Sequence, residues 1–140
     1  MFSVDNYELI YKALNWSDAS IACSVKNAHL AVPMSKEDFS IIQNIVRKMK
    51  YNNIVNLDGS AFRGMVWVGV NNINDEHLWK TVTDINLEDA EFNIFADQDI
   101  NYNSNEWEPH CAGIDAVNYG YRTWWCHRRL PFVCEFMKTN

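Results

Sequence analysis

Glycine, proline and long apolar runs are scarce in this sequence. Five glycines and three prolines among 140 residues do not fit a low-complexity linker or a collagen-like chain. No stretch approaches the roughly 20 consecutive apolar residues that a transmembrane helix needs. The hydrophobic fraction of 48% and the charged fraction of 21% are ordinary for a globular protein, which excludes a disordered chain. We therefore expect a single domain over residues 1–140.

Positive charge is also in short supply. Twelve lysines and arginines face 18 aspartates and glutamates, which gives a formal charge of −6. Such a chain lacks the basic footprint of a nucleic-acid binder, and it does not suit an anionic membrane surface. The largest basic cluster, His127-Arg128-Arg129, is short and typical of a solvated turn. We expect neither nucleic acid nor membrane as a partner.

Common catalytic signatures are missing. The sequence has no Gly-x-Ser-x-Gly elbow, phosphate-binding loop, dinucleotide fingerprint or His-Glu-x-x-His motif. None of its four histidines has a serine or cysteine nucleophile at a recognisable spacing. A carboxylate pair for glycoside hydrolysis would leave no such signature, so that reading stays open. The prediction is a protein that is not an enzyme.

The four cysteines, Cys23, Cys111, Cys126 and Cys134, indicate either two disulfides or a metal site. His110-Cys111 and Cys126-His127 could offer zinc two thiolates and two imidazoles. Adjacent residues of a strand point to opposite faces, however, which disfavours their convergence on one ion. Disulfides are preferred, and they indicate a secreted or lumenal protein. The first five residues do not resemble a signal peptide. Either the signal was removed and Met1 is an expression start, which we favour, or the protein is not secreted.

The first half of the chain predicts strands and two helices. Residues 6–14 are rich in Tyr, Leu and Ile and predict a strand. A helix should begin within Asn15-Trp16-Ser17-Asp18, where the Ser17 hydroxyl can cap it, and should turn Cys23 toward the core. Asn15-Trp16-Ser17 is also an N-glycosylation sequon, and a tightly packed Trp16 would hinder its use.

A short apolar strand should cover residues 28–33, and a second helix should begin near Ser35 with Asp38 as its capping-box partner. The apolar face of this helix is predicted core, and its members are Phe39, Ile42, Ile45, Val46 and Met49.

The second half of the chain predicts more strands and a long loop. Residues 51–64 are polar and predict a loop, whereas 65–70 is the most strand-like run of the sequence. Residues 81–109 show little periodicity, and a loop this long is usually functional or disordered. Three short strands should follow, at 111–117, 121–126 and 131–136.

Four landmarks together resemble the C-type lectin-like domain family over residues 7–136. They are Trp67-Val68-Gly69-Val70, Asn15-Trp16 before a helix bearing Cys23, Cys111 and Cys126 fifteen residues apart, and the closing strand 131–136. The resemblance implies an α+β fold of two helices packed on small antiparallel sheets, with a long loop region. It also implies the pairs Cys23–Cys134 and Cys111–Cys126. The additional N-terminal pair of the long form of the domain is lacking.

Family members bind sugars through a calcium ion, which needs six to eight oxygen ligands. They hold it with a Glu-Pro-Asn or Gln-Pro-Asp triplet and a Trp-Asn-Asp triplet. Here Asn101-Tyr102-Asn103 stands at the first triplet, or Gln98-Asp99-Ile100 in a looser register, and neither contains the proline. The second triplet lies within Arg122-Thr123-Trp124-Trp125. Glu108-Pro109-His110 lies too close to Cys111 to take the first triplet's place. The usual calcium site is therefore predicted to be lost, so no cofactor is assigned and calcium stays possible.

Aromatic residues near the inner cysteines are the other candidates for binding. Trp124 and Trp125 alternate along a predicted strand, so one of them should point outward. Exposed Trp and Tyr can stack on sugars or anchor a protein interface. The ligand-binding candidates are Asn101, Tyr102, Asn103, Trp107, Glu108, Arg122 and Trp124. If calcium binds, the candidate ligands are Asp97, Gln98, Asp99, Asn101, Asn103 and Glu108. Equally, the loop acids could be solvated charges.

The sequence thus predicts a secreted binding module similar to C-type lectins. Its ligand would be a protein or a glycan, bound through the long-loop surface without the usual calcium site. The alternative is a calcium-dependent lectin with a rearranged site. The resemblance leaves innate immune recognition and a venom-like or adhesive role open. Homodimers are common in the family, but no residue here identifies a dimer face.

Overall fold

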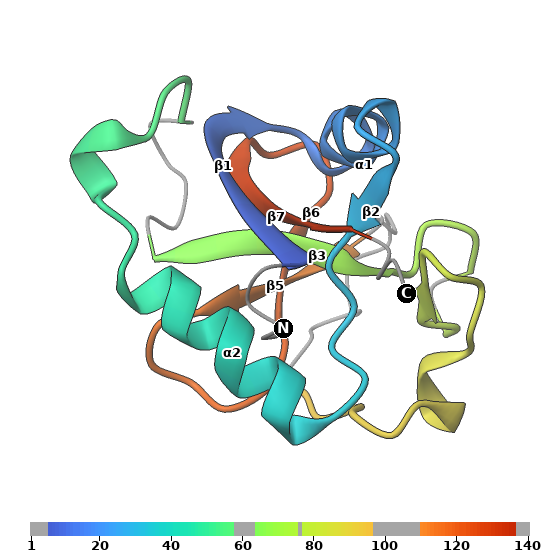
Figure 1. Ribbon diagram of the computed structural model, residues 1–140. Helices are drawn as coiled ribbons and strands as arrows, with labels where there is room; N and C mark the ends of the chain where they lie inside the picture. The colour runs from blue at the N-terminus through green and yellow to red at the C-terminus, as the bar shows by residue number, and fades with distance from the viewer. Residues whose placement is uncertain (1–5, 58–63, 76, 97–109, 137–140) are drawn as a thin grey trace.

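The computed structural model describes residues 6–57, 64–75, 77–96 and 110–136 (Figure 1). It contains two α-helices and a seven-stranded mixed sheet, which confirms the predicted α+β class. The elements in chain order are β1 (Tyr7–Leu14), α1 (Trp16–Val25), β2 (Ala28–Leu30), α2 (Lys36–Arg47), η2 (Tyr51–Asn53), β3 (Met65–Asn71), β4 (Lys80–Thr81), η3 (Leu87–Asp89), β5 (His110–Asp115), β6 (Arg122–Trp125) and β7 (Leu130–Phe136). None of the helices within these described ranges is long and apolar enough to cross a bilayer.

The cap of α1 differs from the sequence prediction. Asn15, not Ser17, caps the helix: its Oδ1 accepts a hydrogen bond from the Asp18 backbone N–H at 2.8 Å. The Asn15 Nδ2 also donates to the Asp18 carboxylate at 3.1 Å. The helix begins at Trp16, because this residue is buried and its indole N–H donates to the Val68 carbonyl. Ser17 is therefore already inside the helix, and the prediction that it is the cap was wrong.

The start of α2 follows its prediction. The Ser35 hydroxyl accepts from the Asp38 backbone N–H at 3.1 Å. Asp38 reaches back one residue further than in a standard capping box, because its carboxylate accepts from the Met34 N–H rather than from that of Ser35. The predicted apolar face packs into the core, where Phe39 and Ile42 are fully buried.

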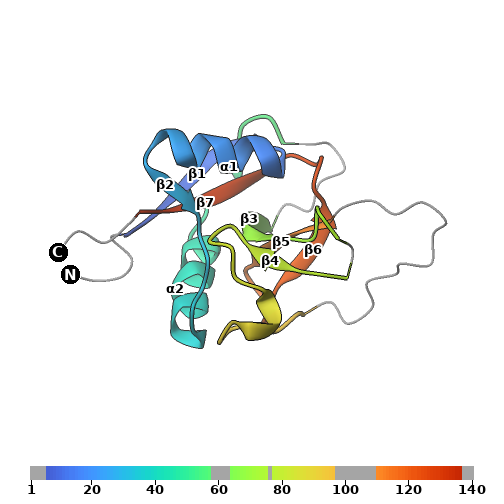
Figure 2. The same cartoon turned by 90° about the vertical axis from the view of Figure 1, so that its right-hand side faces the viewer.

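The sheet runs in the order β1-β7-β3-β5-β6, with β2 paired to β7 and β4 paired to β3. Each pair of these strands is antiparallel except β3 with β7, which pair parallel through Trp67 and Phe132. Figure 2 shows α1 above the sheet and α2 below it. Both faces of the sheet are therefore covered by a helix, and β6 is the last strand in the order.

Strand β3 supplies both halves of the core. Val66, Val68 and Val70 point into the cluster that contains α2, whereas Met65 and Trp67 point into the cluster that contains α1. This is the two-residue alternation of a strand with both faces buried, and it explains why 65–70 reads as an unbroken apolar run. The strand is thus the centre of the fold and the fixed reference for the loops at its ends.

Two disulfides join distant parts of the chain. Cys23–Cys134 ties α1 to β7, and Cys111–Cys126 ties the start of β5 to the residue after β6. Both pairs are those that the family resemblance implied, so that prediction is confirmed. Since all four sulfurs are in disulfides, no thiolate is left for the zinc alternative.

Candidate functional site

Eight of the predicted site residues lie outside the described residues. They are Asp97, Gln98, Asp99, Asn101, Tyr102, Asn103, Trp107 and Glu108. The structure does describe the strand that follows them, β5, and its neighbour β6, which carries the remaining candidates Arg122 and Trp124. The described part of the candidate site therefore lies on β5 and β6.

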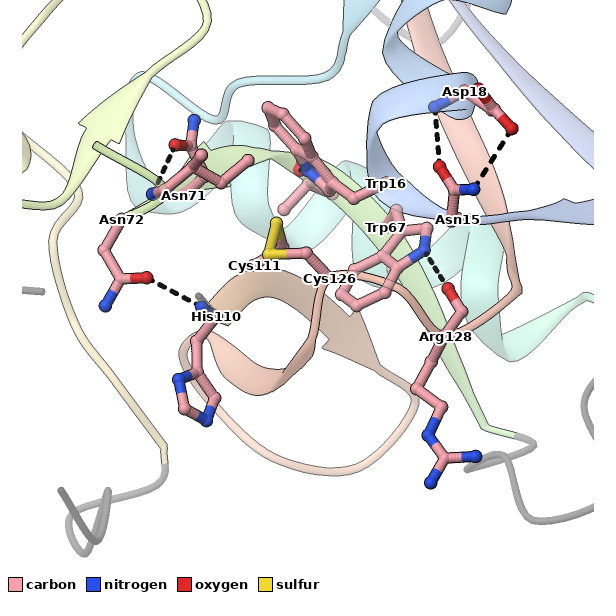
Figure 3. The surroundings of a disulfide bond; sticks show 12 residues. Asn15, Trp16, Asp18, Trp67, Asn71, Asn72, His110, Cys111, Cys126 and Arg128 are labelled. Atoms are coloured by element: carbon pink, nitrogen blue, oxygen red, sulfur yellow. Dashed lines mark hydrogen bonds between the residues drawn. A yellow bond between two sulfur atoms is a disulfide. The ribbon is translucent and has the colours of Figure 1, made fainter. Parts of the chain in front are cut away.

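The start of β5 is firmly held. The His110 N–H donates to the Asn72 side-chain oxygen at 2.7 Å, and the Asn72 N–H donates to the His110 carbonyl at 3.1 Å (Figure 3). The neighbouring Cys111–Cys126 disulfide then fixes β5 to the end of β6. On the other side of that bond, the Trp16 N–H at the start of α1 donates to the Cys126 carbonyl at 2.9 Å. The disulfide end of the sheet is thus a rigid platform.

On this platform Trp125 is an exposed aromatic residue, with 39% of its surface accessible. The His110 ring lies 6.3 Å from the Trp125 ring, centroid to centroid, because these two residues face each other across β5 and β6. The Arg128 guanidinium carbon lies 5.7 Å from the Trp125 ring centroid. The Arg128 backbone N–H donates to the Trp125 carbonyl, which holds the turn that carries the arginine. We call His110, Trp125 and Arg128 the β6 surface.

Trp124 faces the other way. It is half-buried and packs against the core cluster that contains Cys111, and its ring meets that of Trp125 edge-on at 5.8 Å. The prediction that one of the two neighbouring tryptophans points outward is confirmed, and the outward one is Trp125. The predicted ligand residues included Trp124 but not Trp125, and they included neither Arg128 nor His110. Only the register of β5 with β6 and the turn after β6 bring them beside Trp125.

Arg122 is engaged inside the protein. Its Nη1 lies 2.7 Å from the Oδ2 of Asp115, whose side chain is only 3% exposed. Asp115 also accepts hydrogen bonds from the backbone N–H groups of Val117 and Asn118, and from the Asn118 side chain. Burial by itself would raise the pKa of Asp115, but the hydrogen bonds from Asn118, Val117 and Arg122 outweigh it and lower that pKa. The Asp115 carboxylate thus stabilises the fold through these hydrogen bonds and its ion pair with Arg122.

Metal-binding side chains are not gathered in the part of the chain that the structure describes. No group of three or more His, Cys, Asp and Glu residues placed to hold a metal ion occurs there. Strand β6, where the resemblance places a calcium-binding triplet, reads Arg-Thr-Trp-Trp and carries no carboxylate. The predicted calcium ligands at 97–108 lie outside the described residues. The described platform consequently offers aromatic and cationic groups to a ligand.

Comparison with known proteins gives a consistent result. The family model "Lectin C-type domain" matches residues 12–136. The hemolymph lipopolysaccharide-binding protein of the cockroach Periplaneta americana is 25% identical over 122 residues, which are 86% of this chain and 44% of that protein. The chain therefore spans less than half the length of this relative.

Solved structures share the fold at low sequence identity. The carbohydrate-recognition domain of the human scavenger receptor C-type lectin superposes with a TM-score of 0.70 at 17% identity, covering 94% of this chain and 90% of that one. A calcium-independent type II antifreeze protein superposes with a TM-score of 0.62 at 18% identity, covering 91% and 82% of the two chains. At these identities the likeness establishes the fold alone.

Proposed function

Because the chain belongs to the C-type lectin domain family, we propose that it is a secreted binding module that holds a protein or glycan ligand at its long-loop surface without the usual calcium-dependent sugar site. Domains of this family are generally binding modules and not enzymes, in keeping with the missing catalytic signatures. The two disulfides support secretion, since such bonds persist in oxidising compartments. The name of the cockroach relative supports a role in innate immune recognition.

The observation that carries the proposal is the exposed Trp125 ring beside Arg128 on the rigid disulfide end of the sheet. An indole presents a flat apolar face to the C–H groups of a sugar ring or to a side chain of a protein ligand. Arginine adds a planar cationic donor that pairs with carboxylate or phosphate groups. A ligand that combines sugar rings with anionic groups would use both residues, and the cockroach relative is named for binding lipopolysaccharide.

Calcium independence rests on the chemistry of β6. Calcium needs several oxygen ligands, usually including carboxylates. Here a guanidinium, that of Arg122, stands in the triplet region, and its partner Asp115 is buried and saturated with hydrogen bonds. A calcium-independent type II antifreeze protein shares this fold, which is in keeping with the proposal. The alternative is a rearranged calcium site on the residues at 97–108, which would make the protein a calcium-dependent lectin. The proposal includes a homodimer, and no surface of the chain is assigned as its interface.

Replacing Trp125 with alanine should weaken ligand binding about thirtyfold, the equivalent of about 2 kcal/mol for an aromatic anchor at an interface. We would measure binding to immobilised lipopolysaccharide and to a glycan array, with EDTA present. Because the ring is partly exposed, thermal unfolding should show that the variant keeps its fold.

Tyr51→Ala is the matched control, since Tyr51 is an exposed aromatic residue on η2 rather than on the β6 surface. It should leave binding unchanged. Equal affinities of the Trp125→Ala variant and the unmodified protein would contradict the proposed location of the site.

A further inference from the structure

A hollow of about 360 Å³ opens beside β4 and η3, in the segment drawn yellow-green to yellow in Figure 1. It is lined by apolar and polar side chains, and the ones that matter here are His77, Trp79, Leu87, Glu88, Asn93 and Phe95. None of these belongs to the β6 surface. Four of them lie in the long loop 81–109, so the hollow is a second candidate site on the long-loop surface, separate from the β6 surface, and the inference rests in that respect on the function proposed above.

The apolar wall of the hollow is preformed. The Trp79 and Phe95 rings meet with centroids 5.1 Å apart, and Leu87 is buried beneath them. The Leu87 N–H donates to the Trp79 carbonyl at 2.8 Å, which draws η3 against β4. The chain around Phe95 is hydrogen-bonded to Tyr121, since the Ala96 N–H donates to the Tyr121 carbonyl. A ligand would consequently meet a ring wall that needs little ordering on binding.

The polar rim of the hollow carries open acceptors. Glu88 and Asn93 are both exposed, and within the described ranges neither side chain forms a hydrogen bond or ion pair. Lys80, the nearest lysine along the chain, is already paired with Asp84 at 2.9 Å. The Glu88 carboxylate thus faces solvent with no cation of the described chain neutralising it.

Negative charge is concentrated in this part of the chain. Residues 64–96 contain one lysine against six aspartates and glutamates, a formal −5 within a chain total of −6. The field of such a segment attracts cations and adds nothing to the binding of a neutral sugar. Cationic groups and neutral sugars can both pack against an aromatic wall. The negative charge of this segment favours the cationic groups.

We propose that this hollow binds a lysine or arginine side chain of a protein ligand. The cation would lie against the Trp79 and Phe95 rings, whose faces attract positive charge. Glu88 would form an ion pair with this cation, and the side-chain oxygen of Asn93 would accept a hydrogen bond from one of its N–H groups. The aliphatic stem of the same side chain would cover the apolar wall.

The test is an NMR titration of the ¹⁵N-labelled, oxidised protein with Nα-acetyl-arginine amide and Nα-acetyl-lysine amide, followed at the Trp79 indole N–H. Nα-acetyl-norleucine amide is the uncharged control, and glucose is the sugar control. We expect saturable shifts with the two cationic probes, and none with norleucine or glucose. Added salt should weaken the binding, because the charges are near the surface.

Glu88→Gln should weaken binding of the arginine probe about three- to fivefold, the range measured for exposed ion pairs. Glu91→Gln is the matched control, because it removes the same charge from an exposed position outside the hollow lining. It should have a clearly smaller effect. The proposal is overturned if neither cationic probe shifts the Trp79 signal, if the two variants lose affinity equally, or if norleucine or glucose binds as well as arginine does. Loss of lipopolysaccharide binding in Trp125→Ala would leave these results unaffected, so the two sites are tested separately.

Discussion

Replacing Cys23 and Cys134 together with alanine should lower the free energy of unfolding by about 4.7 kcal/mol, the largest change in stability that we expect from any pair of substitutions here. The bond joins residues 111 positions apart, and both cysteines are fully buried between α1 and β7. In the loop-closure account, a crosslink across so long a loop restricts the unfolded chain strongly and so raises its free energy.

Guanidinium denaturation of the oxidised protein and the double variant measures this loss. The control is Cys111→Ala with Cys126→Ala, which opens a loop of only 15 residues and should cost about 3 kcal/mol by the same relation. That second variant should chiefly loosen the β6 surface, because it frees the start of β5 from the end of β6. A loss below 1 kcal/mol for the Cys23–Cys134 pair would contradict the account.

Asp115→Asn should destabilise the fold by about 3 kcal/mol at pH 7, at the lower end of the cost of breaking a buried ion pair. The substitution leaves the Arg122 guanidinium without its charged partner at 2.7 Å. It also sets an amide N–H₂ against the side chain of Asn118, which now donates to the carboxylate. The tie between α2 and this turn would weaken as well, since the Gln43 side chain donates to the carbonyls of Asp115 and Asn118.

The same substitution has a pH signature. The pKa of Asp115 is lower in the folded protein than its ordinary value of 3.8. A group with a lowered folded pKa stabilises the fold above its unfolded pKa, and this contribution is lost as the pH falls through the folded pKa. The stability difference between Asp115→Asn and the unmodified protein should therefore be full at pH 7 and shrink below about pH 4.

Urea unfolding at pH 7 and at pH 2.5 tests this expectation. Asp84→Asn is the control, because Asp84 is an exposed carboxylate whose pair with Lys80 should contribute less than about 1 kcal/mol. A difference between Asp115→Asn and the unmodified protein that stays constant from pH 7 to pH 2.5 would contradict the role assigned to the ionised carboxylate.

Much of the fold could be predicted from local sequence because its signals are local. The cap at Ser35 placed the start of α2 correctly, and the apolar run 65–70 gave β3 to within one residue of its observed bounds. The cap of α1 was missed because a distant contact decides it. Trp16 is fixed by a bond from its indole to Val68, 52 residues away, so the helix begins before Ser17. Asn15 and Ser17 are similarly favourable N-cap residues, so local propensity did not distinguish between them.

Only part of the candidate site could be predicted from the sequence, because distant contacts also determine where its residues lie. Alternation predicted one outward tryptophan in the pair Trp124 and Trp125. The sequence alone does not show that His110 lies opposite Trp125, because this depends on the register of two strands joined by a loop. Trp79 and Phe95, which form the wall of the hollow, lie in a stretch without periodicity and meet only through tertiary contacts.

The central claim is that this C-type lectin domain binds its ligand without calcium. The most direct test is a calcium titration by calorimetry on the oxidised, metal-stripped protein. We predict no saturable heat at micromolar to millimolar calcium, together with binding of the proposed ligand that is the same in calcium and in EDTA. Saturable calcium binding that is lost in Asp99→Asn, accompanied by ligand binding that EDTA abolishes, would contradict the claim and establish the rearranged calcium site instead.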